Sequence, residues 1–189
     1  MQVIKGRLYV GSRAQAQNWT LLQTLGITHI VNVSRDSKEP FEGMLQCLSA
    51  ALSLLAERAA LEVPEEGICN VGFSCGHGGF DVLNVCAGKI KYHQCSIADK
   101  DDVDISVPGA RSWEFIESAF EDASSCVLVH CASGVSRAVT ITTYYLMRKE
   151  SIPCEAALQR IRYGHPAACP NGSFVAQLTA LNSSLARGR

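Results

Sequence analysis

Short apolar runs and amphipathic stretches alternate along most of this chain, and this alternation predicts strands and helices in turn. Residues 8–11 and 27–33 are rich in apolar and β-branched side chains, which is typical of buried strands. Between them, residues 18–25 show helical spacing and are followed by Gly26, a common helix stop. The order indicates an α/β protein.

The second half of the chain continues the same pattern. Trp113, Ile116 and Phe120 recur at helical spacing after Pro108, and proline suits a first helical turn. Phe174, Leu178 and Leu181 repeat the spacing near the end. The predicted elements of this half are strands at residues 89–97 and 126–130, and helices at residues 108–123, 135–148, 153–162 and from 170 onward.

Residues 36–88 interrupt the alternation with a helical stretch at residues 44–61 and a glycine- and cysteine-rich segment. We interpret residues 1–189 as one domain that carries an insertion at about 36–88, since a domain usually has roughly 100 to 200 residues. The helix at 44–61 is expected to pack on its own core, with a partner surface as the alternative.

Composition excludes several classes of protein. Hydrophobic residues make up 47% of the chain, which is too many for a disordered one, and the net charge of -1 gives no general affinity for nucleic acid or anionic membranes. There is no apolar run of the ~20 residues that a membrane span needs, and the first residues do not resemble a signal peptide. Nine irregularly spaced cysteines are expected to stay reduced. We therefore expect an intracellular protein, in the cytoplasm or the nucleus.

A loop of small residues joins the predicted strand at 126–130 to the next helix. Backbone N–H groups converge at such a junction and the helix dipole favours negative charge, so the loop is expected to bind phosphate. Cys131 lies at its mouth, where the same potential stabilises a thiolate and makes a nucleophile. The residues expected to surround the phosphate are Ala132, Ser133, Gly134, Val135, Ser136 and Arg137.

Arg137 follows the cysteine by six positions, in the predicted first turn of the helix. Its planar guanidinium can bind two phosphoryl oxygens at once, which lysine cannot do. An enzyme catalyses phosphoryl transfer mainly by positioning the reacting groups and by stabilising the charge on the transferred phosphoryl group. The pattern therefore predicts in-line attack by Cys131 and a phosphocysteine intermediate.

The leaving oxygen needs a proton from a carboxylic acid on another loop. Asp99 is the preferred candidate because it follows a predicted strand end, where loops gather above an α/β sheet. The same group would then act as base toward the hydrolytic water. Asp101, Asp102 and Asp104 are the competitors.

These residues resemble the dual-specificity branch of the protein tyrosine phosphatases, whose motif is His-Cys, five residues and Arg. Residues 8–12 and 26–34 resemble the opening of that family, and Asp99 sits where the family has its general acid. The end of the chain resembles the close of the family at Pro170-Asn171, Phe174 and Gln177-Leu178.

The resemblance implies a mixed sheet of about five strands flanked by helices. It also implies hydrolysis without metal or cofactor, and a shallow pocket for phosphotyrosine, phosphoserine and phosphothreonine. Related phosphoinositide phosphatases often carry lysines in the loop, and this loop has none, which favours a phosphoprotein substrate.

Two departures from the family pattern are the insertion at 36–88 and Ala138. The family usually has Ser or Thr directly after the loop arginine, where the hydroxyl helps the cysteine to leave. Slow turnover is therefore one expectation, and it supports an alternative hypothesis of a phosphopeptide-binding module. A phosphatase acting on a non-protein phosphate ester is a third hypothesis.

His130 is expected to tune the loop by hydrogen bonding, with its side chain directed away from the substrate. Asn171 either braces the loop or caps its own helix. Cys126 is expected in the core, with a disulfide to oxidised Cys131 as the alternative. A zinc site is not expected, because the candidate ligands lack a Cys-x-x-Cys pair; these ligands are Cys69, Cys75, His77 and Cys86.

Overall fold

A computed structural model describes residues 2–35 and 90–187 of the chain. These residues pack together as one compact unit. The predicted insertion, the helix at 44–61 and the four candidate zinc ligands lie outside the described residues, so the single-domain assignment stays a prediction.

Strands and helices alternate along the described chain. The strands are β1 (Gln2–Ile4), β2 (Leu8–Ser12), β3 (His29–Asn32), β4 (Lys91–Gln94) and β5 (Val127–Cys131). The helices are α1 (Arg13–Ala16), α2 (Trp19–Thr24), α5 (Ser106–Phe120), α6 (Arg137–Glu150), α7 (Cys154–Gly164) and α8 (Gly172–Arg187).

The five strands form one sheet in the order β1-β2-β5-β3-β4. β1 pairs antiparallel with β2, and the other neighbours are parallel. The expectation of a mixed sheet of about five strands flanked by helices is therefore confirmed. β5 lies in the middle, so the carboxyl ends of β2, β3 and β5 meet at one edge.

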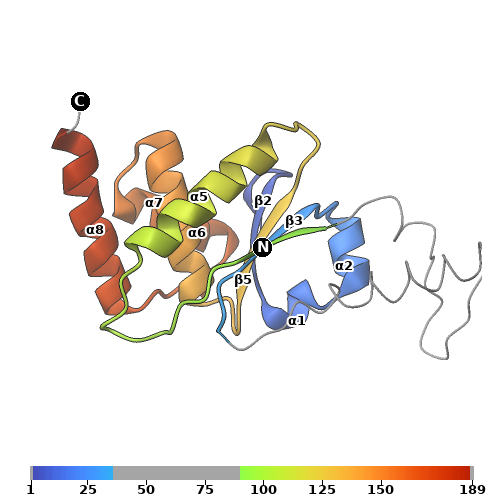
Figure 1. Cartoon of the computed structure of the whole chain (residues 1–189), viewed down its shortest axis with the longest axis horizontal. Helices are drawn as coiled ribbons and strands as arrows, with labels where there is room; N and C mark the ends of the chain where they lie inside the picture. Colours follow the sequence, from blue (N-terminus) through green and yellow to red (C-terminus); the bar gives the residue numbers. More distant parts are fainter. Residues whose placement is uncertain (1, 36–89, 188–189) are drawn as a thin grey trace, which may run out of the picture. The chain divides into compact units, whose positions relative to one another are not determined.

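The helices lie on both sides of the sheet. Figure 1 shows α5, α6, α7 and α8 on one side and the short α1 and α2 on the other. α6 packs against β5 and β2 as well as against α5, α7 and α8, so it is the central helix of its layer. This arrangement buries both faces of β3 and β5 and nearly all of β2, as their apolar runs predict.

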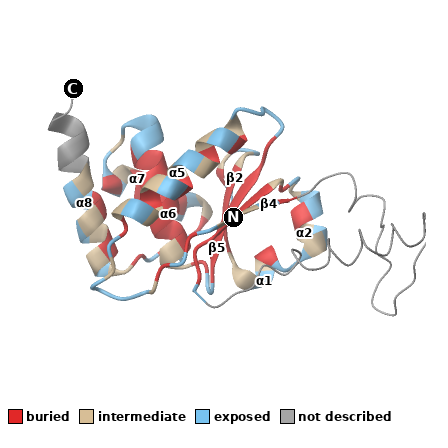
Figure 2. Cartoon of the chain, in the orientation of Figure 1, coloured by how far each residue is buried: buried red, intermediate tan, exposed pale blue. Residues whose placement is uncertain are grey.

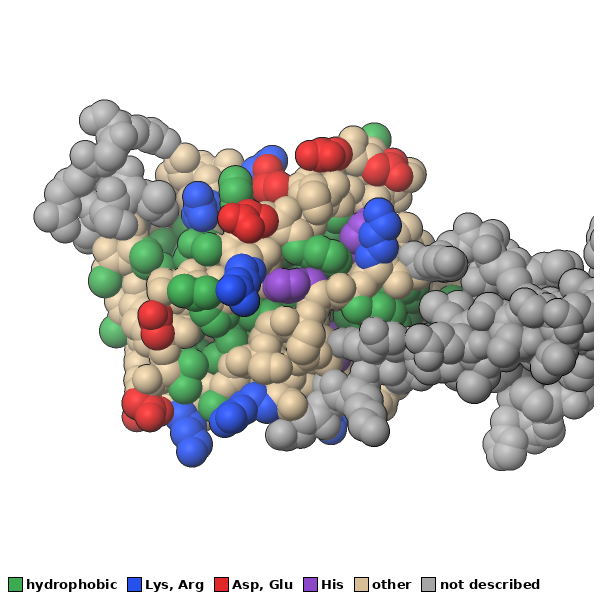
Figure 3. All heavy atoms as spheres, in the orientation of Figure 1, with side chains coloured by type: hydrophobic (Ala, Val, Ile, Leu, Met, Phe, Trp, Pro, Cys, Tyr) green, Lys and Arg blue, Asp and Glu red, His purple; other side chains and the backbone are tan. Residues whose placement is uncertain are grey.

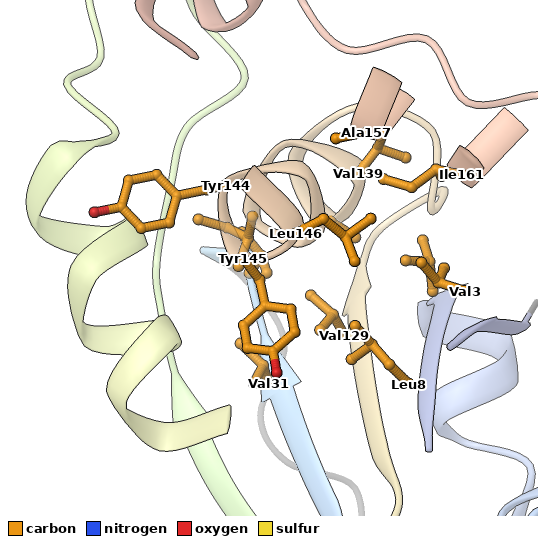
Figure 4. Close-up of a cluster of buried hydrophobic side chains, with 14 of the residues drawn as sticks. Val3, Leu8, Val31, Val129, Val139, Tyr144, Tyr145, Leu146, Ala157 and Ile161 are labelled. Carbon is orange, nitrogen blue, oxygen red and sulfur yellow. The ribbon is translucent and has the colours of Figure 1, made fainter. Parts of the chain in front are cut away.

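The main core lies between α6 and the sheet (Figure 2). Every residue of β5 is buried, as is the run from Ala138 to Met147 in α6. In Figure 4, Tyr145 lies between α6 and the strand residues Val31 and Val129. Val139, on the same helix, lies beside Ala157 and Ile161 of α7. The strand and helix that carry the phosphate loop are thus anchored in this core.

Helix α5 begins two residues before the predicted start at Pro108. Asp104 stabilises its first turn by accepting hydrogen bonds from the Ser106 N–H (2.8 Å) and the Ser106 hydroxyl (2.9 Å). Proline is tolerated as the third helical residue because the first N–H groups of a helix have no acceptor within it. α5 ends at Phe120, three residues before the predicted end.

Helix α6 begins at Arg137, two residues later than predicted, because Val135 and Ser136 still belong to the loop. It ends at Glu150, and the residue that follows, Ser151, caps the helix with a left-handed φ of 55°.

The short elements β1 and α1 were not predicted. A signal for α1 is present: Ser12 and Gln15 form a capping box in which the Ser12 N–H donates to Gln15 Oε1 at 2.8 Å. β1 has only three residues, too few for an alternation to stand out.

No helix within the described ranges has the length and apolar character needed to cross a membrane. On the face in Figure 3, acidic and basic side chains are interspersed with apolar ones. That view shows no patch of one sign, in keeping with the net charge of -1.

Candidate active site

The candidate site lies at the carboxyl edge of the sheet. Ser12, the last residue of β2, pairs with Cys131, the last residue of β5. Residues 131–137, here called the phosphate loop, lead from β5 directly into α6. This strand, loop and helix start is the anion-binding geometry that the sequence predicts.

Cys131 is held by the loop that it opens. Its side chain is buried, and its Sγ accepts a hydrogen bond from the Gly134 N–H at 3.2 Å. This hydrogen bond holds the sulfur against the backbone of the phosphate loop.

Gly134 is required by the shape of the phosphate loop. Its φ of 78° lies in the left-handed region. A Cβ at this position would lie 2.7 Å from the carbonyl carbon and oxygen of Gly11. The close approach of the two backbones leaves no room for a side chain, so the loop can close against β2 only with glycine here.

Ser136 connects the phosphate loop to two other segments. Its hydroxyl donates to Asp99 Oδ1 at 2.8 Å and accepts a hydrogen bond from the Asn171 N–H at 3.0 Å. Ala132 and Ser133 are exposed at the mouth of the loop, while Ser136 is half-buried.

Arg137 is directed toward the segment between β4 and Asp99. Its guanidinium donates to the Ile97 carbonyl at 3.2 Å, and its Nε lies 3.7 Å from Asp99 Oδ2. The Arg137 side chain is 15% exposed and that of Asp99 is 38% exposed. The Asp99 carboxylate therefore lies nearer to solvent than the Arg137 guanidinium.

The competing carboxylates are placed differently. The Asp104 side chain accepts both Ser106 hydrogen bonds, and these bonds hold its pKa below the usual value, so Asp104 is ionised at neutral pH and carries no proton to donate. Asp101 and Asp102 are exposed. Within residues 2–35 and 90–187, Asp99 is the acidic residue whose side chain contacts the phosphate loop, through Ser136 and Arg137.

Helix α8 holds residues 98–105, here called the acid loop. The Gln177 side chain donates to the Val103 carbonyl at 2.9 Å and accepts from the Ile105 N–H at 3.0 Å. The Ser173 hydroxyl donates to the Asp101 carbonyl at 2.6 Å. Sequence reasoning singled out Gln177 only through the family resemblance, because its hydrogen-bond partners are more than 70 residues away in the chain.

His130 is buried next to the nucleophile. Its Nδ1 lies 3.4 Å from the Cys131 carbonyl, and its Nε2 has no hydrogen-bond partner among the described residues. Burial, opposed by the contact with the Cys131 backbone, lowers the pKa of His130 to about 4. His130 is therefore neutral at physiological pH.

Asn171 uses its backbone and its side chain for different purposes. Its N–H donates to Ser136, while its Oδ1 accepts from the Ser173 N–H at 2.8 Å. The side chain thus caps the start of α8, and the backbone braces the phosphate loop.

Cys126 is too far from Cys131 for a disulfide. It is buried, its Sγ donates to the Gly6 carbonyl, and burial raises the pKa of its thiol. It precedes β5 while Cys131 ends it, and five residues of strand span roughly 16 Å. Disulfides require Cα atoms within about 7 Å. Cys126 is therefore a core residue, and the alternative of a disulfide with Cys131 is wrong.

In residues 2–35 and 90–187, no three His, Cys, Asp or Glu side chains gather in a group that could hold a metal ion. The five cysteines in these ranges are free thiols: Cys95, Cys126, Cys131, Cys154 and Cys169.

Comparison with known proteins gives the class of this fold and site. Residues 68–184 match the family model described as dual specificity phosphatase, catalytic domain. The match covers more than half of the chain and includes the whole phosphate loop. This chain belongs to the dual specificity phosphatase family. The matched span begins inside the segment predicted as an insertion.

Curated relatives carry the same family name. Dual specificity protein phosphatase Mpk3 of Drosophila melanogaster is 40% identical over 99 residues, which are 52% of this chain and 24% of that protein. Dual specificity protein phosphatase 1 of Arabidopsis thaliana is 28% identical over 183 residues, 97% of this chain and 69% of that protein. Human dual specificity protein phosphatase 4 is 28% identical and covers 94% of this chain, which matches 34% of its length. The matched part of the chain thus spans about a quarter of the Drosophila protein and about a third of the human protein.

Solved structures share the fold. Human DUSP28 matches with a TM-score of 0.69 and 21% identity, covering 100% of this chain and 99% of its own. Human tyrosine phosphatase-like serine/threonine/tyrosine-interacting protein matches with a TM-score of 0.64 and 20% identity, covering 98% and 96%. At these identities the likeness concerns the fold.

Proposed function

We propose that this chain is a protein phosphatase that hydrolyses phosphotyrosine, phosphoserine and phosphothreonine through a phosphocysteine on Cys131. The observation that carries the proposal is the cluster at the phosphate loop: the Cys131 sulfur accepts the Gly134 N–H, while Arg137 and Asp99 approach each other beside Ser136. Membership of the family supports a phosphorylated protein as substrate.

In the first step the Cys131 thiolate attacks phosphorus in line with the ester bond. The new S–P bond forms as the P–O bond to the leaving group breaks, and Asp99 gives its proton to the departing oxygen. Arg137 turns its guanidinium toward two phosphoryl oxygens and stabilises the charge that develops there.

In the second step a water molecule attacks the phosphocysteine. The Asp99 carboxylate takes a proton from this water, the S–P bond breaks, and Cys131 leaves as a thiolate with release of inorganic phosphate. Both steps need Asp99 close to the phosphate loop, and its hydrogen bond from Ser136 supports this position.

The second candidate is a phosphopeptide-binding module that forms the phosphocysteine but hydrolyses it slowly. Ala138 favours it, because this fully buried residue follows Arg137 and offers no hydroxyl to the departing sulfur. The fold does not distinguish the phosphatase from the binding module, since the same fold occurs in the solved tyrosine phosphatase-like serine/threonine/tyrosine-interacting protein.

Hydrolysis of p-nitrophenyl phosphate separates the candidates. The phosphatase predicts a linear product trace over many turnovers, and Cys131→Ser abolishes it. A single burst of about one product per enzyme supports the binding module. Linear turnover that survives in Cys131→Ser contradicts both.

A substrate panel tests the substrate class. Phosphotyrosyl and phosphothreonyl peptides are compared with phosphoinositides and phosphorylated sugars, and the proposal expects hydrolysis of the peptides. We propose the cytoplasm as the compartment, with the nucleus as the alternative, because nine irregularly spaced cysteines indicate a protein that keeps its thiols reduced.

A further inference from the structure

We infer that His165 is a positioning residue for the phosphate loop: its imidazole fixes the Gly134 carbonyl and thereby turns backbone N–H groups toward the bound phosphoryl group. His165 directly follows α7, far from Cys131 in the sequence. The inference rests on the proposed function and names one device by which this chain shapes that site.

The contact is short and buried. His165 Nε2 lies 2.8 Å from the Gly134 carbonyl oxygen, and the side chain belongs to a residue that is 6% exposed. A carbonyl oxygen can only accept a hydrogen bond, so Nε2 must carry the hydrogen. The backbone N–H of His165 donates to the Ile161 carbonyl at 2.7 Å, which fixes the residue at the end of α7.

Gly134 is thereby held at both ends. Its N–H donates to the Cys131 sulfur, and its carbonyl accepts from His165. In a trans peptide unit the C=O and the next N–H point in opposite directions. The described residues contain no cis peptide bond, so fixing the Gly134 carbonyl toward His165 directs the Val135 N–H the other way.

The next peptide unit is held from the same side. The Cys169 N–H donates to the Val135 carbonyl at 3.0 Å, which directs the Ser136 N–H away from residue 169. The Asn171 N–H then reaches the Ser136 hydroxyl. Segment 165–171 therefore contacts three consecutive residues of the phosphate loop.

Only the first of these three contacts depends on a side chain of the segment. The N–H groups at positions 169 and 171 would be supplied by any residue except proline. The bond to Gly134 comes from an imidazole, so substitution at 165 removes it selectively. Without this hydrogen bond the Gly134 carbonyl is free to rotate away from its position. A neutral hydrogen bond of this kind changes an equilibrium constant, here that of oxyanion binding, by a factor of about ten at most.

The test measures oxyanion binding without turnover. Each variant is made in the Cys131→Ser background, and the Kd for inorganic tungstate is measured by isothermal titration calorimetry. His165→Leu keeps an apolar side chain in the buried site but has no donor. His165→Gln can place an amide N–H near the position of Nε2, while the shorter His165→Asn cannot reach it.

We expect tungstate to bind about tenfold more weakly to the Leu and Asn variants than to the parent, with the Gln variant within about threefold of it. A purely structural role would lower the melting temperature without separating Gln from Asn. If Leu fails to fold, the comparison of Gln with Asn decides alone. Equal Kd values for these two overturn the inference and leave the proposed function standing. A parent that binds no tungstate overturns both.

Discussion

Ser136 joins three parts of the candidate site through one hydroxyl group. It lies in the phosphate loop, donates to Asp99 and accepts the Asn171 N–H. Because the carboxylate already contacts the loop before a substrate binds, little reorganisation is needed to bring it to the leaving oxygen. The position of Asp99 makes its acid role testable with leaving groups of different basicity.

Asp99→Asn should lower kcat/KM by about 100-fold or more for phenyl phosphate, whose leaving oxygen needs a proton, and far less for p-nitrophenyl phosphate. Steady-state kinetics on the two esters measure the difference. Asp102→Asn, at an exposed position of the same loop, is the control and should leave both rates unchanged. An equal loss on both esters would remove Asp99 from the acid role.

His130 should make the fold less stable in mild acid. The pKa of His130 is about 6.5 in the unfolded chain and about 4 in the folded chain. Between these two pH values the unfolded chain binds a proton at His130 and the folded chain does not, so protonation favours unfolding. Above pH 6.5 His130 is neutral in both states, and its contribution to the free energy of unfolding is fully present. About 3 kcal/mol of this free energy is lost as the pH falls from 6.5 to 4.

Urea unfolding of His130→Gln at several pH values measures this effect. The stability of the variant should fall less steeply than that of the wild type across this range, while Cys131→Ser, which keeps His130, should follow the wild type. Parallel curves for His130→Gln and wild type would contradict the burial of a neutral imidazole.

Single residues of the site differ in how far the sequence reveals them. Cys131 and Arg137 stand in one local motif, and Asp99 follows a strand end, so their proximity was predictable. The contacts of His165 and Gln177 were not, since each joins residues at least 31 positions apart. The sequence also left two roles open for Asn171, and the structure gives one to its backbone and one to its side chain.

At the scale of elements, helix α8 fixes the acid loop. The Gln177 amide bridges the Val103 carbonyl and the Ile105 N–H, and so holds the loop between Asp99 and the start of α5. A loop released from α8 would still carry Asp99, but would hold it less often beside the phosphate loop.

Gln177→Leu should therefore lower kcat/KM for phenyl phosphate by about tenfold and change p-nitrophenyl phosphate hydrolysis much less, as an acid-dependent defect does. In an Asp99→Asn background the same substitution should have little further effect. Thr179→Ala is the control, because its exposed hydroxyl donates within α8 to the Val175 carbonyl. Full additivity of the two losses would show that Gln177 does not act through Asp99.

Element boundaries show where local patterns stop being sufficient. The spacing of Trp113, Ile116 and Phe120 predicts α5, but its start depends on Asp104, which accepts from Ser106 two residues before Pro108. The start of α6 depends on the turn at Gly134, where contact with the backbone of Gly11 keeps the chain in the loop. The first residue of each helix thus depends on contacts that the spacing of apolar residues does not reveal.

At the scale of the whole molecule, the sheet creates the site by bringing strand ends together. The alternation of apolar runs and amphipathic helices predicts an α/β fold because parallel strands need both faces covered. The spatial order, in which β5 lies between β2 and β3, is a tertiary property that the pattern does not encode. This order places Ser12 and α1 next to Cys131.

Detection of the phosphoenzyme is the decisive test of the proposed phosphocysteine mechanism. Asp99→Asn is mixed with p-nitrophenyl phosphate, quenched in acid and digested, and mass spectrometry locates the phosphate. We expect phosphate on Cys131, in larger amount than in the wild type because the base for the second step is missing. Turnover without a phosphorylated residue, or with phosphate on another side chain, would contradict it.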